Sequence, residues 1–247
     1  MQYTSERLIV DDQNSDIYKE HIARYKFCLP FVKNKTVLDI ACGSGYGAKL
    51  IADNQADNVF AGDISQTAID LAIKRYSASN LIFKKMDACQ ISFEHNYFDI
   101  IISFETIEHI QDYKKFAQEI YRCLKPNGRL VLSTPNKQAV QKLGIKNKFH
   151  LKEFSQEELL KLLNNYFKNV ELFGQRPISC TNRLQKLLKK LHLTINKIPF
   201  LGVLRDNLHL ALRHKAGQRI DGLNNDFSIR KISKNQDYLY LIAVCEK

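Results

Sequence analysis

The sequence predicts an α/β protein with a doubly wound, mostly parallel sheet, and three observations favour this fold class. Short apolar runs typical of buried strands alternate with helical patterns between residues 36 and 135. The first of these runs leads into a helix through a glycine-rich turn. A long basic segment then separates the alternating region from one last apolar run. We therefore expect an α/β core with an inserted basic helical segment.

The first strand and helix are joined by a turn that suits a bound ligand. The run Val37–Ile40 has the length and β-branched content of a buried parallel strand, and residues 48–52 follow a helical pattern. Between them lie Gly43 and Gly45. Glycine has no Cβ and tolerates a positive φ, so a ligand can approach the backbone closely. The alternative interpretation is a turn that serves packing alone.

Two aspartates suggest which ligand this turn would bind. Asp63 ends the next apolar strand, twenty residues after Gly43, where a carboxylate can accept hydrogen bonds from two ribose hydroxyls. Asp39 lies inside the first strand, four residues before Gly43. A carboxylate there would repel a diphosphate but would attract a cationic group. S-adenosylmethionine fits this requirement, because it has a sulfonium, an ammonium and no phosphate.

These residues resemble the first motif of the class I S-adenosylmethionine-dependent methyltransferases, which is an acidic residue, three further residues and then Gly-x-Gly. Ala41 stands where many members have another glycine. The resemblance covers about residues 36–175 and 237–246. It implies a Rossmann-like, seven-stranded sheet in which an antiparallel last strand at 237–245 pairs with 169–174. It also implies S-adenosylmethionine as the cofactor.

The resemblance assigns the cofactor to residues at the ends of the first four strands. An acid after the third strand, Asn80–Lys85, would accept a hydrogen bond from the adenine amino group, and Asp87 stands there. The alternative role for Asp87 is that of a turn aspartate. The full set of expected cofactor-binding residues is Asp39, Ala41, Gly43, Gly45, Asp63, Ile64, Asp87, Ala88 and Phe104.

We expect four parts along the chain. Residues 1–35 form an N-terminal helical cap with a helix at 16–33, in which neither Arg24 nor Tyr25 has an assigned role beyond covering the cofactor. Residues 36–176 form the Rossmann-like core, with strands at 98–104 and 129–134 and a helix at 112–124 between them. Residues 177–235 form the basic helical insertion, and 236–247 the last strand.

A second group of polar residues follows the fourth strand. Glu105, Glu108 and His109 have spacings of three and four, which place them on one face if they begin a helical turn. His150 precedes a helix that opens with a capping box at Ser155. Two carboxylates and two imidazoles suit Mg²⁺, Mn²⁺ or Zn²⁺, and imidazole favours the latter two.

This pattern is similar to that of two methyltransferase branches that act on oxygen. One contains the ubiquinone-pathway O-methyltransferases and their relatives in polysaccharide clusters; the other contains the small-RNA 3′-terminal 2′-O-methyltransferases. The resemblance implies that His109 and Glu105 are catalytic and that Glu105, Glu108, His109 and His150 bind a metal. The alternatives are that His109 is a base without a metal, that the glutamates form a solvated first turn, and that His150 only holds a loop.

The basic segment contributes most of the net charge of +11. Its residues from 177 to 220 include nine lysines and arginines and one acid, Asp206. Two amphipathic helices are expected, at 183–193 and near 204–212. They can form a lid whose cations face water, or receive an anionic acceptor, an anionic membrane surface or RNA. The lack of interleaved aromatic residues argues against RNA.

These observations predict a cytoplasmic methyltransferase that acts on the hydroxyl of a small molecule or glycan, such as a sugar intermediate or a quinone precursor. The acceptor can be anionic or lipid-linked, and the protein can contact a membrane peripherally. The sequence has no apolar run of about eighteen residues that would span a membrane. It also has neither a signal-peptide pattern nor paired C-x-x-C spacing among its six cysteines. The alternatives are an RNA 2′-O-methyltransferase and a non-catalytic S-adenosylmethionine-binding protein.

Overall fold

The fold was analysed in a computed structural model that describes residues 15–178, 226–233 and 236–247 of the chain. The two predicted helices of the basic segment, at 183–193 and 204–212, lie outside the described residues. Within the described residues, no helix has the length and apolar character needed to cross a membrane.

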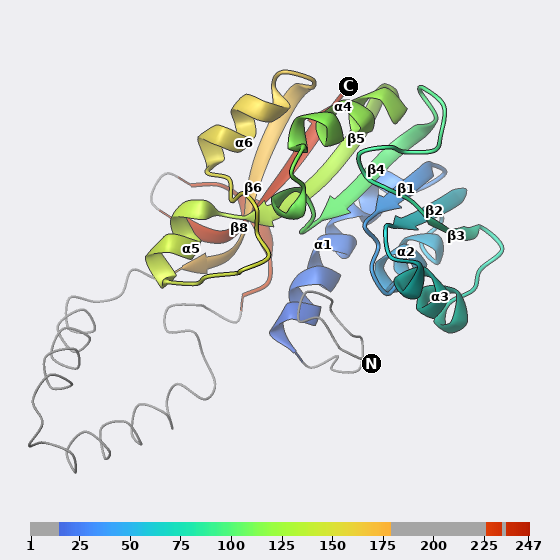
Figure 1. Cartoon of the computed structure of the whole chain (residues 1–247), viewed down its shortest axis with the longest axis horizontal. Helices are drawn as coiled ribbons and strands as arrows, with labels where there is room; N and C mark the ends of the chain where they lie inside the picture. Colours follow the sequence, from blue (N-terminus) through green and yellow to red (C-terminus); the bar gives the residue numbers. More distant parts are fainter. Residues whose placement is uncertain (1–14, 179–225, 234–235) are drawn as a thin grey trace, which may run out of the picture.

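The strands form one sheet in the order β3-β2-β1-β4-β5-β8-β6-β7 (Figure 1). The first five strands run parallel, and β8 pairs antiparallel with β5 and β6. The strands are β1 Thr36–Ile40, β2 Asn58–Asp63, β3 Leu81–Lys85, β4 Phe98–Phe104, β5 Leu124–Pro135, β6 Lys168–Ile178, β7 Ile229–Lys231 and β8 Asp237–Glu246. This arrangement confirms the predicted mostly parallel, doubly wound sheet.

Two details of the sheet differ from the sequence prediction. The sheet has an eighth strand, the three-residue β7, which pairs with β6 from within the segment expected to be an insertion. The fifth strand begins at Leu124, whereas the sequence analysis placed it at residues 129–134. The turn-forming residue Asn127 keeps a positive φ of 60°. The pairing of β5 with β4 therefore continues on both sides of a local irregularity at Pro126, Asn127 and Gly128.

The helices follow the predicted alternation, and the described α-helices other than α2 begin at side-chain caps. Ser65 accepts a hydrogen bond from the backbone of Ala68, Asp112 from Lys115, and Ser155 with Glu158 forms a complete capping box. The helices are α1 Asp16–Val32, α2 Tyr46–Ala52, α3 Gln66–Arg75, α4 Tyr113–Cys123, α5 Lys137–Leu143 and α6 Gln156–Leu163, with a short 3₁₀ helix, η1, at Ile107–His109. The sequence pattern did not predict α5.

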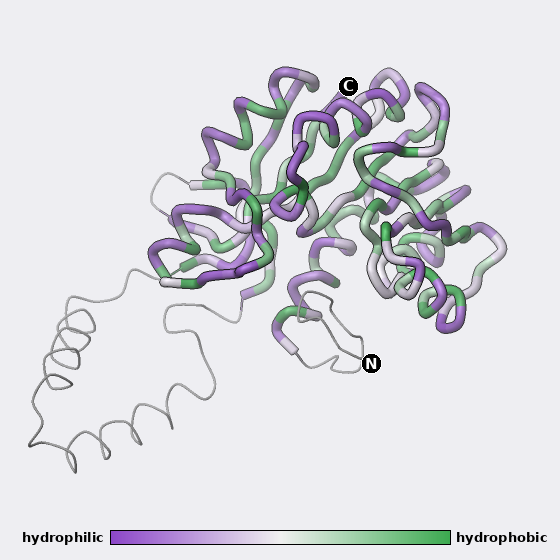
Figure 2. Tube along the Cα trace, viewed as in Figure 1, coloured by the Kyte–Doolittle hydropathy of each residue, from purple (hydrophilic) through white to green (hydrophobic). Residues whose placement is uncertain are grey.

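Apolar side chains form a separate core on each face of the sheet. One core joins the sheet to α4 and α6 through residues such as Phe116 and Leu159. The other joins it to α1, α2 and α3 through residues such as Cys28, Ile51 and Ile69. In Figure 2 the hydrophobic segments follow the central strands, and the hydrophilic ones lie on the outer helices and loops. Both faces of the sheet are therefore covered by helices. Because β1, β2, β4 and β5 run parallel, their carboxyl ends meet at one edge, where ligands bind in folds of this kind.

Candidate functional site

Asp39 lies near the carboxyl end of β1 and is buried. Its exposed fraction is 1%, and its two carboxylate oxygens lie 3.2 and 3.1 Å from the hydroxyl of Tyr25 in α1. Burial raises the pKa of Asp39 to about 7; the hydrogen bond from Tyr25 opposes this shift and the nearby Asp63 adds to it. A cationic group beside Asp39 would offset its burial, so the residue fits a positively charged ligand.

Asp63 joins the glycine turn to β2. Its Oδ2 accepts a hydrogen bond from the backbone N–H of Gly43 at 3.0 Å, and its Oδ1 accepts one from Ser65 at 2.8 Å. The carboxylate of Asp63 therefore links the glycine turn to the start of α3. Next to it, Ile64 is 64% exposed, which places an apolar side chain at the edge where a ligand would lie.

The turn after β1 requires backbone conformations that favour glycine. Gly43 and Gly45 have φ values of 56° and 84°, and Ala41 has a φ of 63°. A Cβ on Gly45 would lie 2.7 Å from Phe83 and 2.8 Å from Ala72, so only glycine fits there. A Cβ on Gly43 would meet nothing within 4 Å. The open space beside Gly43 suits the approach of a ligand to the backbone.

The remaining expected cofactor-binding residues occupy different environments. Asp87 is exposed, and its Oδ1 accepts a hydrogen bond from the backbone of Cys89 at 2.8 Å, so it does act in a turn. Ala88 is partly buried against the core. Phe104 is 6% exposed and packs edge-to-face on Tyr25, with ring centroids 5.0 Å apart.

Glu108 belongs to η1 and is fully buried. Its Oε2 accepts a hydrogen bond from the hydroxyl of Thr134 at 2.9 Å, and its Oε1 has no hydrogen-bond partner. Burial raises the pKa of Glu108 well above its ordinary value, and Glu105 adds to the shift. An unpaired carboxylate oxygen in the interior is costly, so this atom favours a cation or a proton.

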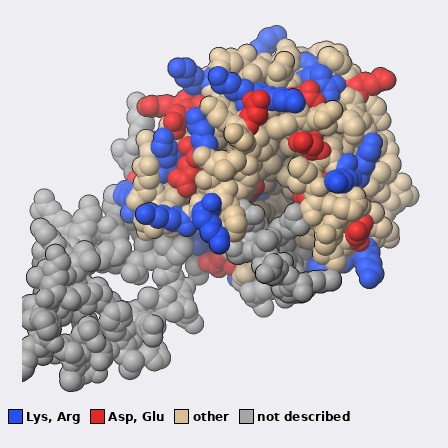
Figure 3. All heavy atoms as spheres, viewed as in Figure 1, with Lys and Arg blue, Asp and Glu red and all other residues tan. Residues whose placement is uncertain are grey.

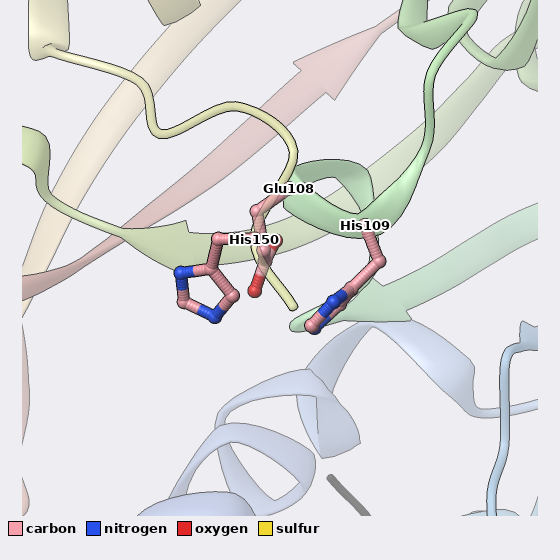
Figure 4. A group of neighbouring side chains, drawn as sticks. All are labelled: Glu108, His109 and His150. Atoms are coloured by element: carbon pink, nitrogen blue, oxygen red, sulfur yellow. The ribbon is translucent and has the colours of Figure 1, made fainter. Parts of the chain in front are cut away.

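His109 and His150 lie beside Glu108. One possible ligand atom from each of the three residues lies within 4.8 Å of the other two, and Figure 4 shows the Glu108 carboxylate between the two imidazoles. The Nδ1 of His109 lies 3.1 Å from the carbonyl oxygen of Phe149, which is the acceptor for a proton on Nδ1. His150 is held by Asn147 at 2.8 Å and by Glu153 at 3.3 Å.

Glu105 does not belong to this group of three. It has a φ of 49°, and its Oε1 accepts a hydrogen bond from Ser133 at 2.6 Å and pairs with Arg24 at 3.1 Å. The expectation that Glu105, Glu108 and His109 share one helical face fails because η1 begins only at Ile107. The left-handed backbone at Glu105 turns the chain before the helix starts.

A comparison with protein families matches the part of the chain that runs from β1 into β5. The family model described as a methyltransferase domain matches residues 38–132, which include the last three residues of β1, the glycine turn and η1. This part of the chain is therefore similar to the methyltransferase domains of known proteins. That match supports the general resemblance found in the sequence, and with it S-adenosylmethionine as the cofactor.

The chain matches two curated methyltransferases over only part of the length of each. A "probable S-adenosylmethionine-dependent methyltransferase" of Mycobacterium tuberculosis is 32% identical over 163 residues, which are 65% of this chain and 58% of the relative. Phosphoethanolamine N-methyltransferase 2 of Caenorhabditis elegans is 33% identical over 119 residues, 47% of this chain and 27% of the relative. The chain therefore spans less than two thirds of both relatives.

A solved structure supports the same fold. The YcgJ protein of Bacillus subtilis superposes with a TM-score of 0.61 at 18% identity, over 92% of this chain and 98% of that one. At this identity the likeness concerns the methyltransferase fold alone.

Glu108, His109 and His150 also fit a metal ion. One carboxylate and two imidazoles form a donor set that suits Mn²⁺ or Zn²⁺, and the unpaired Oε1 of Glu108 is an atom such an ion would satisfy. A carboxylate behind a ligating imidazole fixes its orientation, and Glu153 stands in that relation to His150. Glu105, expected as a fourth ligand, is paired elsewhere.

The sequence analysis missed two residues of the site, Tyr25 and Gly47. A Cβ on Gly47 would overlap the ring of Tyr25, so this glycine makes the room that lets Tyr25 reach Asp39. The sequence contained a signal for this contact, because Gly47 is a third glycine in this stretch. It is required neither for a positive φ nor for the approach of a ligand. Such a glycine indicates a bulky neighbour, although its identity could not be known from the sequence.

Proposed function

We propose that the protein is an S-adenosylmethionine-dependent O-methyltransferase acting on a hydroxyl of a small molecule or glycan. The observation that carries this proposal is the position of Glu108, His109 and His150. They lie after the carboxyl end of β4, beside the strand whose glycine turn belongs to the cofactor site. A sugar or polysaccharide intermediate, or a quinone precursor as in the ubiquinone-pathway branch, is the acceptor class we favour.

In this proposal the two halves of the site have separate tasks. Asp39 attracts the cationic end of the cofactor, Asp63 accepts from the ribose, and Ile64 covers the adenine. The bound cofactor supplies a methyl group on a sulfonium, which an oxygen nucleophile can displace in line. Positioning of the acceptor and exclusion of water supply most of the rate enhancement.

An alcohol is a weak nucleophile at neutral pH, so the acceptor half has to activate it. With a proton on Nδ1, the ring of His109 is suited to receive the hydroxyl proton on Nε2, which contributes roughly 10²–10⁴-fold in rate. A metal held by Glu108, His109 and His150 would instead lower the pKa of the bound hydroxyl. Both roles involve His109, whereas only the metal also requires Glu108 and His150.

Transfer of labelled methyl groups to a cell extract tests the function. We expect the full chain to label an acceptor that survives nuclease treatment and has the stability to acid and base of a methyl ether. His109→Ala should bind S-adenosylhomocysteine normally and transfer at least a hundredfold less, whereas exposed His95→Ala should behave as wild type. Loss of the label on nuclease treatment would indicate an RNA 2′-O-methyltransferase. Cofactor binding with no labelled product would indicate a non-catalytic binding protein.

The identity of the methylated atom needs its own measurement, because one relative is named a phosphoethanolamine N-methyltransferase. Mass spectrometry of the purified product separates the two classes. A methylamine product would contradict the proposed O-methylation and leave methyl transfer intact.

A further inference from the structure

Two consecutive residues of α1 each contact one carboxylate of the site. Tyr25 donates to Asp39, at the end of β1, and Arg24 pairs with Glu105, at the end of β4. The first carboxylate belongs to the half of the site proposed for the cofactor, and the second directly precedes η1, which carries Glu108 and His109 of the half proposed for the acceptor. One helix therefore contacts both halves through neighbouring side chains.

Arg24 is rigidly held in the interior. It has no exposed surface, its Nε donates to the side-chain carbonyl of Gln175 at 2.7 Å, and its guanidinium lies over the ring of Tyr240 at 4.2 Å. Gln175 is fixed in turn, because its amide donates to the backbone carbonyls of Glu20 and Phe227 at 3.0 Å each. The planar guanidinium makes all these contacts at once, which an ammonium cannot do.

Glu105 needs such support because its backbone is strained. A left-handed φ of 49° is unfavourable for a non-glycine residue, and such a conformation persists only where surrounding contacts impose it. The contacts are the backbone N–H bond to the Ser133 carbonyl at 3.1 Å, the Ser133 hydroxyl bond and the Arg24 ion pair. Glu108 and His109 follow within four residues, so the conformation at Glu105 directs the chain into η1.

The N-terminal half of α1 is fastened to the sheet independently. Arg176 of β6 pairs with Glu20 at 3.1 Å and with Asp16 at 3.2 Å, and its own φ is 59°. These ion pairs hold the N-terminal half of α1 on the sheet, and Arg24 and Tyr25 follow further along the same helix.

We propose that Arg24 and Tyr25 are positioning residues through which α1 sets both halves of the site. Arg24 acts on the acceptor half through Glu105, and Tyr25 acts on the cofactor half through Asp39. The catalytic part of this inference rests on the proposed methyl transfer. If α1 only covered the core, substitutions of Arg24 and of Tyr25 would change both halves of the site alike. If the two residues position the site, each substitution changes one half only.

The test compares Arg24→Gln and Tyr25→Phe in the full chain. Hydrogen exchange is followed over residues 39–47 and 104–110, and S-adenosylhomocysteine affinity is measured by calorimetry. We expect Tyr25→Phe to weaken that affinity by about tenfold and to speed exchange only in residues 39–47. We expect Arg24→Gln to speed exchange in residues 104–110 by about tenfold, lower methyl transfer at saturating cofactor and leave the affinity within about twofold.

Two further variants keep the comparison clean. Arg24→Lys retains the charge but not the fork, so it should restore part of the protection at 104–110 and covers the case in which Arg24→Gln fails to fold. Arg122→Gln removes an arginine that pairs with Glu119 at 2.8 Å on α4, and it should change neither region. Equal loosening of both regions by both α1 variants would overturn the inference, as would unchanged exchange at 104–110 in Arg24→Gln and Arg24→Lys. Failure of the proposed function would look different: no variant, nor wild type, would transfer methyl groups.

Discussion

The backbone N–H of Gly43 donates to the carboxylate of Asp63 at 3.0 Å, across the twenty residues that separate the glycine turn from the end of β2. This bond brings a second carboxylate close enough to Asp39 to help raise its pKa. Because both residues are acids, the cofactor half of the site places two carboxylates close together at a buried position. Such a site gains from a cationic ligand and loses from an anionic one.

The first prediction concerns cofactor affinity and pH. Burial raises the pKa of Asp39 to about 7, so in the absence of ligand a growing fraction of Asp39 is protonated as the pH falls below 7. A cationic ligand binds the ionised form, and its affinity should fall by up to about tenfold per pH unit below this pKa and level off above pH 8. Calorimetry from pH 5.5 to 8.5 measures this directly. Asp39→Asn should bind weakly with a flat profile; an equally flat wild-type profile would contradict the assignment of Asp39.

The second prediction concerns stability in the absence of ligand. The pKa of Asp39 is about 7 in the folded protein and near 3.8 in the unfolded chain, so the folded state binds the extra proton between these values. The free energy of unfolding therefore falls as the pH rises from about 4 to 7, by an amount on the order of a few kcal/mol from this residue. Thermal melts should show Asp39→Asn more stable than wild type at pH 8, with the difference shrinking toward pH 5. A difference independent of pH would argue against burial as its cause.

The third prediction concerns the space that Gly47 leaves for Tyr25. Gly47→Ala places a methyl group into the Tyr25 ring and should cost about 1–3 kcal/mol of stability. Because the penalty comes from one overlap, Tyr25→Ala should remove it, so the double variant loses less than the sum of the single ones. Chemical denaturation of the four proteins measures the coupling. Additive losses would mean that another neighbour of Gly47 decides the fit.

The sequence predicted the parallel sheet well because apolar periodicity and helix caps are local signals. The segments β4 and β8 and the caps Ser65 and Ser155 are read from neighbouring residues. The three-residue β7 could not be predicted, because its pairing with β6 depends on residues more than fifty positions away. For the same reason the site was incomplete. Arg24 and Tyr25 lie on a helix whose pattern indicates only a buried stripe, and their partners come from distant strands.

The fourth prediction tests the departure from the family pattern at Ala41. Its φ of 63° is costly for alanine and free for glycine, although glycine loses about 0.5–1 kcal/mol of chain entropy on folding. Ala41→Gly should therefore be neutral or stabilise the protein by up to about 1 kcal/mol. Ala48→Gly, in the helical backbone of α2, is the matched control and should destabilise by about 1 kcal/mol or more. Melting temperatures that fall equally in both would show that the backbone at Ala41 is not strained.

The fifth prediction separates a metal from a lone base in the acceptor half. If Glu108, His109 and His150 hold an ion, the protein loaded with Mn²⁺ or Zn²⁺ should retain about one equivalent after gel filtration and lose it with a chelator. Glu108→Gln and His150→Ala should each abolish retention, and exposed His95→Ala should not. Methyl transfer should stop on chelation and return with the ion. If His109 acts alone as the base, chelation and His150→Ala leave transfer unchanged while His109→Ala still removes it, because the proton acceptor then needs neither the ion nor the second imidazole.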